Sequence, residues 1–131
     1  MKKIYIIDDD RDIVESLSII LRANGYEVQA QYNDENAVEN VALYNPDLII
    51  LDVMFPENSA AGFEIARSLK RNDKLIKIPI IMLSAVNERG IYVGRFSNQD
   101  IEDTWLPVSL FIDKPVQPSE LLAQVAAMLN K

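Results

Sequence analysis

The chain has 131 residues, a formal net charge of −7, no cysteine and no histidine. One domain of this length can bury a stable core, and without cysteine it has neither disulfides nor thiolate metal sites. Without histidine, the usual zinc ligand and the Ser-His-Asp arrangement are excluded. The acidic balance argues against binding nucleic acid, and no apolar stretch is long enough for a membrane span. The N-terminus lacks a signal peptide, so we expect a cytoplasmic protein without membrane contact.

The first half of the chain alternates between strand and helix patterns. Residues 4–7 form a short apolar run typical of a buried strand, residues 26–30 alternate like a strand nearer an edge, and residues 48–51 form another buried strand. The two helices between them are predicted by apolar residues at helical spacing. Those residues are Ile13, Val14, Leu17, Ile20 and Leu21 in the first helix, and Ala37, Val38, Val41 and Ala42 in the second. Asn24-Gly25 and Asn45-Pro46 are the expected stops.

The second half continues the alternation. A weaker helix is predicted from the spacing of Phe63, Ala66 and Leu69, followed by strands at residues 78–83 and 110–112. A last helix begins near Pro118, with a buried face expected from Leu121, Leu122, Val125, Met128 and Leu129. Only residues 87–107 lack a clear pattern, although a short helix over 99–105 is one interpretation. Strands alternating with helices predict a parallel α/β sheet with helices on both faces.

Polar residues stand where the predicted strands end. Asp8 and Asp9 close the first strand, Asp52 closes the third, Ser84 the fourth and Lys114 the fifth. The carboxyl ends of parallel strands open onto one edge of the sheet, where ligands bind. Carboxylates, a hydroxyl and an ammonium at that edge suit a hard cation such as Mg²⁺ and a phosphoryl group.

Each of these residues also has an ordinary structural interpretation. An acidic run is typical of a helix start, and we expect Asp10 and Asp12 to have that role. Asp52 and Ser84 could serve as turn or hydroxyl-to-carbonyl residues, and Lys114 as a surface lysine. However, two carboxylates about 4 Å apart repel by roughly 4 kcal/mol at an effective dielectric of about 20. Three clustered carboxylates therefore need a cation and Lys114 nearby.

Four segments, in order, resemble a known family. IYIIDDD, PDLIILDVMFP, IPIIMLSA and FIDKPV each follow or contain a predicted strand, and together they resemble the receiver domain of two-component response regulators. The resemblance runs from Ile4 to Leu129. It implies a flavodoxin-like, doubly wound sheet of five parallel strands in the order 2-1-3-4-5.

The resemblance also implies a role for each polar residue. Asp52 would be the phosphoacceptor, Asp9 and Asp52 would bind Mg²⁺ (or Mn²⁺) directly, and Asp8 would bind it mostly through water. The backbone carbonyl of Met54 would complete the protein ligands. Lys114 and Ser84 would hold the phosphoryl oxygens, and Ser84 and Phe111 would form the conformational switch. An aromatic residue on a strand is, however, usually only part of a core.

The family further implies a signalling protein rather than an enzyme, with only self-catalysed phosphorylation and dephosphorylation. We expect a single receiver domain over residues 1–131 without an effector domain. A histidine kinase or phosphotransfer protein would supply the phosphoryl group, and an unidentified downstream protein would receive the signal. A monomer or weak homodimer is expected. The chain departs from the family at residues 55–62, a longer loop, and at 84–114, where the fourth-helix region is long and irregular.

Two alternatives stay open at this point. Asp8 and Asp10, with Ser84 and Lys114, also resemble the haloacid-dehalogenase-type phosphohydrolases, in which Asp8 would be the nucleophile and Asp10 the acid. That interpretation leaves Asp52 unexplained, and the chain lacks the cap insertion of those enzymes. The second alternative is a receiver-like module that binds its partners without phosphorylation.

Overall fold

The computed structural model describes residues 1–52, 61–85, 110–114 and 117–129, and it contains a five-stranded sheet. The strands are β1 (Lys3–Ile7), β2 (Glu27–Gln31), β3 (Leu48–Asp52), β4 (Ile80–Ala85) and β5 (Leu110–Lys114). Every neighbouring pair is parallel and the order is β2-β1-β3-β4-β5. The predicted flavodoxin-like topology is therefore confirmed.

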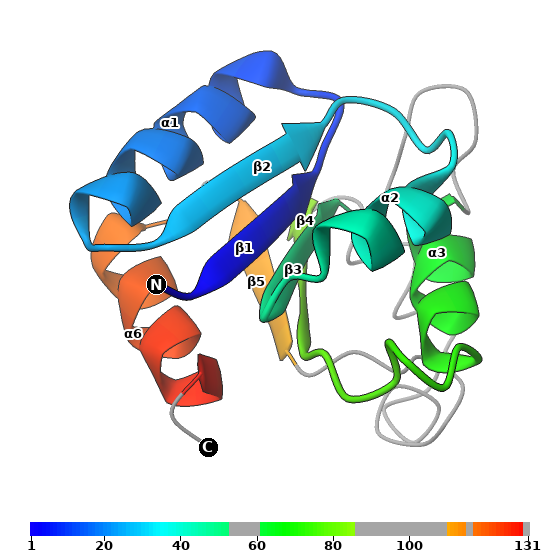
Figure 1. Ribbon diagram of the computed structural model, residues 1–131. Helices are drawn as coiled ribbons and strands as arrows, with labels where there is room; N and C mark the ends of the chain where they lie inside the picture. Colours follow the sequence, from blue (N-terminus) through cyan, green and yellow to red (C-terminus); the bar gives the residue numbers. More distant parts are fainter. Residues whose placement is uncertain (53–60, 86–109, 115–116, 130–131) are drawn as a thin grey trace.

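Within the described residues, four helices cover the two faces of the sheet. They are α1 (Arg11–Ala23), α2 (Ala37–Tyr44), α3 (Ala61–Lys70) and α6 (Pro118–Leu129). Figure 1 shows α1 and α6 on one side of the sheet and α2 and α3 on the other. Among the described helices, none is both long and apolar enough to cross a bilayer.

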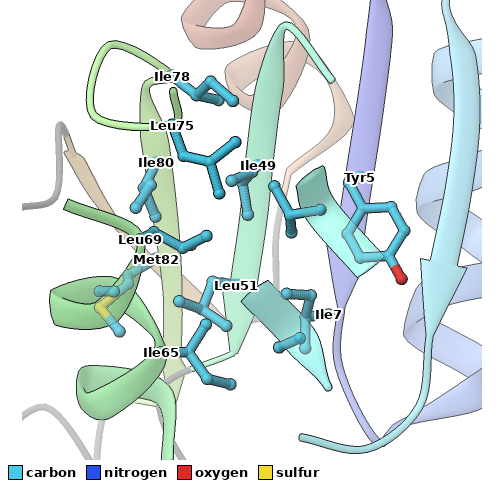
Figure 2. Close-up of a cluster of buried hydrophobic side chains, with 13 residues drawn as sticks. Tyr5, Ile7, Ile49, Leu51, Ile65, Leu69, Leu75, Ile78, Ile80 and Met82 are labelled. Carbon is cyan, nitrogen blue, oxygen red and sulfur yellow. The ribbon is translucent and has the colours of Figure 1, made fainter. Parts of the chain in front are cut away.

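The two faces form separate halves of the core because side chains alternate along each strand. Ile4 and Ile6 of β1 pack with β3, β4 and β5 against α1 and α6. Tyr5 and Ile7 pack on the opposite face against α2 and α3, where Leu69 of α3 reaches the strands (Figure 2). Burial of β3 on both faces explains its unbroken apolar sequence.

Local signals in the sequence account for the helix ends. Asp10 caps α1 by accepting hydrogen bonds from the backbone N–H groups of Asp12 and Ile13, as predicted. Gly25, after the helix, has φ of 89°, which glycine adopts without strain. Asn45 follows α2 with φ of 54°, a conformation that asparagine tolerates. Pro118 begins α6 at the position where its missing N–H costs nothing.

Several boundaries differ from the predicted ones. β2 begins and ends one residue later than expected, and β4 begins at Ile80 rather than Ile78. The delay in β4 arises because residues 71–79 form a turn whose carbonyls at Ile76 and Ile78 accept hydrogen bonds from Lys70 Nζ, at 2.8 and 2.7 Å. Ala42 was wrongly assigned to the buried stripe of its helix, because it is exposed. The short helix expected over 99–105 lies outside the described residues.

A pair of leucines on neighbouring helices tests this account of the core. Leu69→Ala should lower the free energy of unfolding by about 2–5 kcal/mol, because Leu69 is fully buried and its removal leaves a cavity. Leu43→Ala, at a residue that is 85% exposed, should change it by less than about 0.5 kcal/mol. Urea denaturation measures both changes, provided that the unfolding free energy of each variant has the same dependence on urea concentration. Equal losses of unfolding free energy in the two variants would contradict the assigned burial.

Candidate functional site

The strand register brings the first two acidic segments together. Ile7 of β1 lies opposite Leu51 of β3, so the next residues, Asp8 and Asp52, leave the two strands side by side. β1 and β3 are neighbours inside the sheet, and both end at the edge where ligands bind in this topology. The predicted convergence of these two residues therefore follows from backbone pairing.

Three carboxylates meet at this edge. Asp8, Asp9 and Asp52 each offer an oxygen, and these oxygens lie within 4.8 Å of one another. Asp8 is fully buried and Asp52 is only 2% exposed, whereas Asp9 is more exposed. At an effective dielectric of about 20, two such charges repel by roughly 3–4 kcal/mol per pair. A hard cation relieves this repulsion, and a set of carboxylate oxygens is the type of ligand that Mg²⁺ prefers.

Backbone contacts hold the acidic loop in place. The Asp8 N–H donates to the Gln31 carbonyl at 3.2 Å, which continues the pairing of β1 with β2. The Asp10 N–H donates to Asp8 Oδ1 at 2.9 Å, and Asp10 itself caps α1. The start of the helix, the end of β2 and the Asp8 carboxylate are thus connected. Such a fixed loop lowers the cost of ordering the carboxylates when a ligand binds.

Gln31 is a residue whose importance the sequence did not reveal. Its Oε1 accepts hydrogen bonds from Tyr5 Oη at 2.7 Å and from Asn40 Nδ2 at 3.0 Å. Its Nε2 donates to the carbonyls of Asn33 and Glu35 at 2.6 and 3.1 Å. Burial raises the pKa of the Tyr5 hydroxyl, which keeps it protonated and able to donate. This network connects the core, β2 and α2 directly beside the acidic loop.

The strand register shows where the backbones of the remaining predicted residues lie. Ser84 lies in β4 opposite Asp113, one position beyond where the prediction ended that strand, and Lys114 is the last residue of β5 opposite Ala85. Both are at the same edge of the sheet as the carboxylates. Phe111 is the second residue of β5, opposite Met82. Met54 lies outside the described residues, and so does the loop over 53–60.

Comparison with known proteins agrees with the geometry. The profile of the response regulator receiver domain family matches residues 4–126. The phosphate regulon transcriptional regulatory protein PhoB of Pseudomonas aeruginosa is 36% identical over 130 residues, which cover 99% of this chain and 52% of that protein. The chain thus spans about half the length of the curated relatives it matches.

Two solved structures show the same architecture. The chemotaxis protein CheY4 of Vibrio cholerae superposes with a TM-score of 0.80 at 25% identity, covering 98% of this chain and 99% of that one. The receiver domain of a signal transduction histidine kinase from Syntrophus aciditrophicus has a TM-score of 0.77 at 30% identity, covering 99% and 91%. Both superpose along nearly the whole of this chain, which therefore shares their fold.

The carboxylate cluster makes a prediction about stability. Asp52→Asn should raise the melting temperature of the metal-free protein by several degrees, because it removes one of the three clustered charges. Mg²⁺ should raise the melting temperature of the original chain, since it binds only the folded cluster, and should raise that of Asp52→Asn less. Calorimetry at low ionic strength measures both effects. A melting temperature indifferent to Mg²⁺ and to the substitution would contradict a charged cluster at this edge.

Proposed function

Because this chain belongs to the response regulator receiver domain family, we propose that Asp52 accepts a phosphoryl group from a histidine kinase or phosphotransfer protein in a Mg²⁺-dependent reaction. The observation that carries this proposal is the convergence of Asp8, Asp9 and Asp52 at the ligand-binding edge of the sheet. A buried carboxylate beside two others has a chemical reason to hold a cation, and an exposed acidic turn does not.

In this proposal Asp52 acts as the nucleophile. One of its carboxylate oxygens would form a bond to phosphorus while the bond from phosphorus to the donor's nitrogen or oxygen breaks, and the leaving group takes the bonding electron pair. Asp9 and Asp52 would hold Mg²⁺ directly, Asp8 through water, and Met54 through its backbone carbonyl. The bound Mg²⁺ would neutralise charge on the phosphoryl oxygens, so that positioning and electrostatics supply most of the catalysis.

In this proposal, Lys114 and Ser84 bind the phosphoryl group from the β4–β5 side of the site. Their strands end at the same edge as β3, and an ammonium and a hydroxyl are suitable donors to phosphoryl oxygens. In this proposal the bound phosphoryl group draws Ser84 inward, and Phe111 of β5 moves into the space that Ser84 leaves. Phosphorylation would then bias an existing two-state element on the β4–β5 side of the sheet.

The contacts of Asp10 favour this assignment over a phosphohydrolase. In the hydrolase interpretation Asp10 would be the acid that passes a proton to the leaving group. Here its carboxylate accepts hydrogen bonds from the N–H groups of Asp12 and Ile13, at 3.0 and 3.3 Å, and thus serves the start of α1. Asp52, which that interpretation leaves without a role, lies within the carboxylate cluster.

The signal would leave the domain through altered protein contacts. We propose that a downstream protein recognises the phosphorylated surface, that the domain acts as a monomer or weak homodimer, and that it contacts neither nucleic acid nor membrane directly. The formal net charge of −7 supports the absence of a direct nucleic-acid contact. Turnover of other substrates is not part of this function, since the only chemistry proposed is on the chain's own Asp52.

Intact-mass spectrometry after incubation with acetyl phosphate tests the proposal. The chain should gain the mass of one phosphoryl group when Mg²⁺ is present, because Asp52 then has both a donor and charge compensation. The gain should disappear in Asp52→Asn and after chelation of the metal. Asp8→Asn should still leave Asp52 as the modified residue, at a lower rate.

The outcomes separate the alternatives. Modification at Asp8, or sustained hydrolysis of a generic phosphate ester that Asp8→Asn abolishes, would support the phosphohydrolase. No modification with acetyl phosphate or with a phosphorylated kinase, together with no stabilisation by beryllofluoride and Mg²⁺, would leave a binding module that works without phosphorylation.

A further inference from the structure

An arginine and a tyrosine stack beside the acidic site. The guanidinium carbon of Arg11 lies 4.2 Å from the centroid of the Tyr32 ring, a cation–π contact. Arg11 is the first residue of α1, two positions after Asp9. Tyr32 follows Gln31, whose carbonyl accepts the Asp8 N–H. The start of α1 and the end of β2 lie at the same end of the molecule (Figure 1).

The stability of α1 does not explain an arginine at this position. The N-terminal end of a helix carries partial positive charge, so a cation there is unfavourable and acidic residues are preferred. Pairing with Glu15 one turn later would place the positive residue first, the less favourable order for such pairs. Tyr32 is 39% exposed, so the stack is a surface feature and contributes little to the core.

We propose that Arg11, held in orientation by Tyr32, is a positioning residue that guides anionic phosphoryl donors into the acidic site. This inference rests on the function proposed above. A phosphoryl donor is an anion, and it must approach a cluster of three carboxylates. A fixed positive charge at the rim offsets that repulsion and raises the local concentration of the donor. The stack restrains a side chain that would otherwise sample many rotamers.

The test compares phosphoryl donors of different charge, because an electrostatic effect of Arg11 depends on the charge of the donor. A unit charge about 10 Å from a dianion in water changes its local concentration about four-fold, and that of a monoanion about two-fold, at low ionic strength. Arg11→Gln should therefore slow phosphorylation by dianionic acetyl phosphate about four-fold and by monoanionic phosphoramidate about two-fold. Both losses should vanish near 1 M salt, where the Debye length is about 3 Å.

Binding of Mg²⁺ alone supplies a readout of opposite sign. Removal of the positive charge should tighten Mg²⁺ binding to Arg11→Gln, measured by titration calorimetry without any donor. Rates are measured at saturating Mg²⁺ so that this change does not affect them. A merely structural role for Arg11 would weaken metal binding and phosphorylation together.

Matched variants separate position from charge. Arg71→Gln makes the same charge change just after the end of α3, at the end of the sheet opposite to the acidic cluster. This variant should leave the phosphorylation rates with both donors unchanged. Tyr32→Leu should lose part of the acetyl phosphate rate because the guanidinium is no longer held. Tyr32→Phe keeps the aromatic face and should retain that rate.

Equal losses with both donors, losses that persist in high salt, or an equal loss in Arg71→Gln would overturn the proposal. An Arg11→Gln protein that reacts as fast as the original chain would overturn it as well, and would leave Asp52 as the phosphoacceptor. If the original chain gains no phosphoryl group from the small donors or from a phosphorylated kinase, the proposed function fails instead, and the Mg²⁺ titration still reports whether the charge of Arg11 reaches the acidic cluster.

Discussion

Repulsion among three carboxylates at the end of β1 and β3 is the interaction on which the proposed chemistry of this domain depends. The parallel register that makes the core also forces Asp8 and Asp52 together, because each follows the last core residue of adjacent strands. The sheet cannot relax this contact without shifting every buried side chain to the wrong face. Core packing therefore offsets a local electrostatic cost, and it holds the three carboxylates together.

The same packing explains how neighbouring elements share the task of holding the site. Asp8 is fixed from β2 through the Gln31 carbonyl and from α1 through the Asp10 N–H. Gln31 is in turn held by Tyr5 within the core and by Asn40 of α2. Elements from both faces of the sheet thus meet around one loop.

The alternation of strand and helix patterns predicted a parallel sheet, in which inner strands such as β3 appear as unbroken apolar runs, while the strand order came from the resemblance to receiver domains. The sequence predicted the cluster of Asp8, Asp9 and Asp52 because strand ends in a parallel sheet share an edge. It could not predict the role of Gln31 or the stack of Arg11 on Tyr32. Those contacts join the side chains of residues that are far apart in the sequence, and no local sequence pattern indicates them. The exposed Ala42 shows the same limit, since helical spacing alone does not define the width of a buried stripe.

The outer strand β2 has a consequence for self-association. An edge strand offers unpaired backbone groups to which another chain could add. Here that strand has only five residues, its sequence is EVQAQ, and Glu27 and Gln29 are exposed while only Val28 is buried. A second chain would have to desolvate a carboxylate and amides to extend the sheet at this edge. The composition of β2 thus disfavours edge-to-edge aggregation.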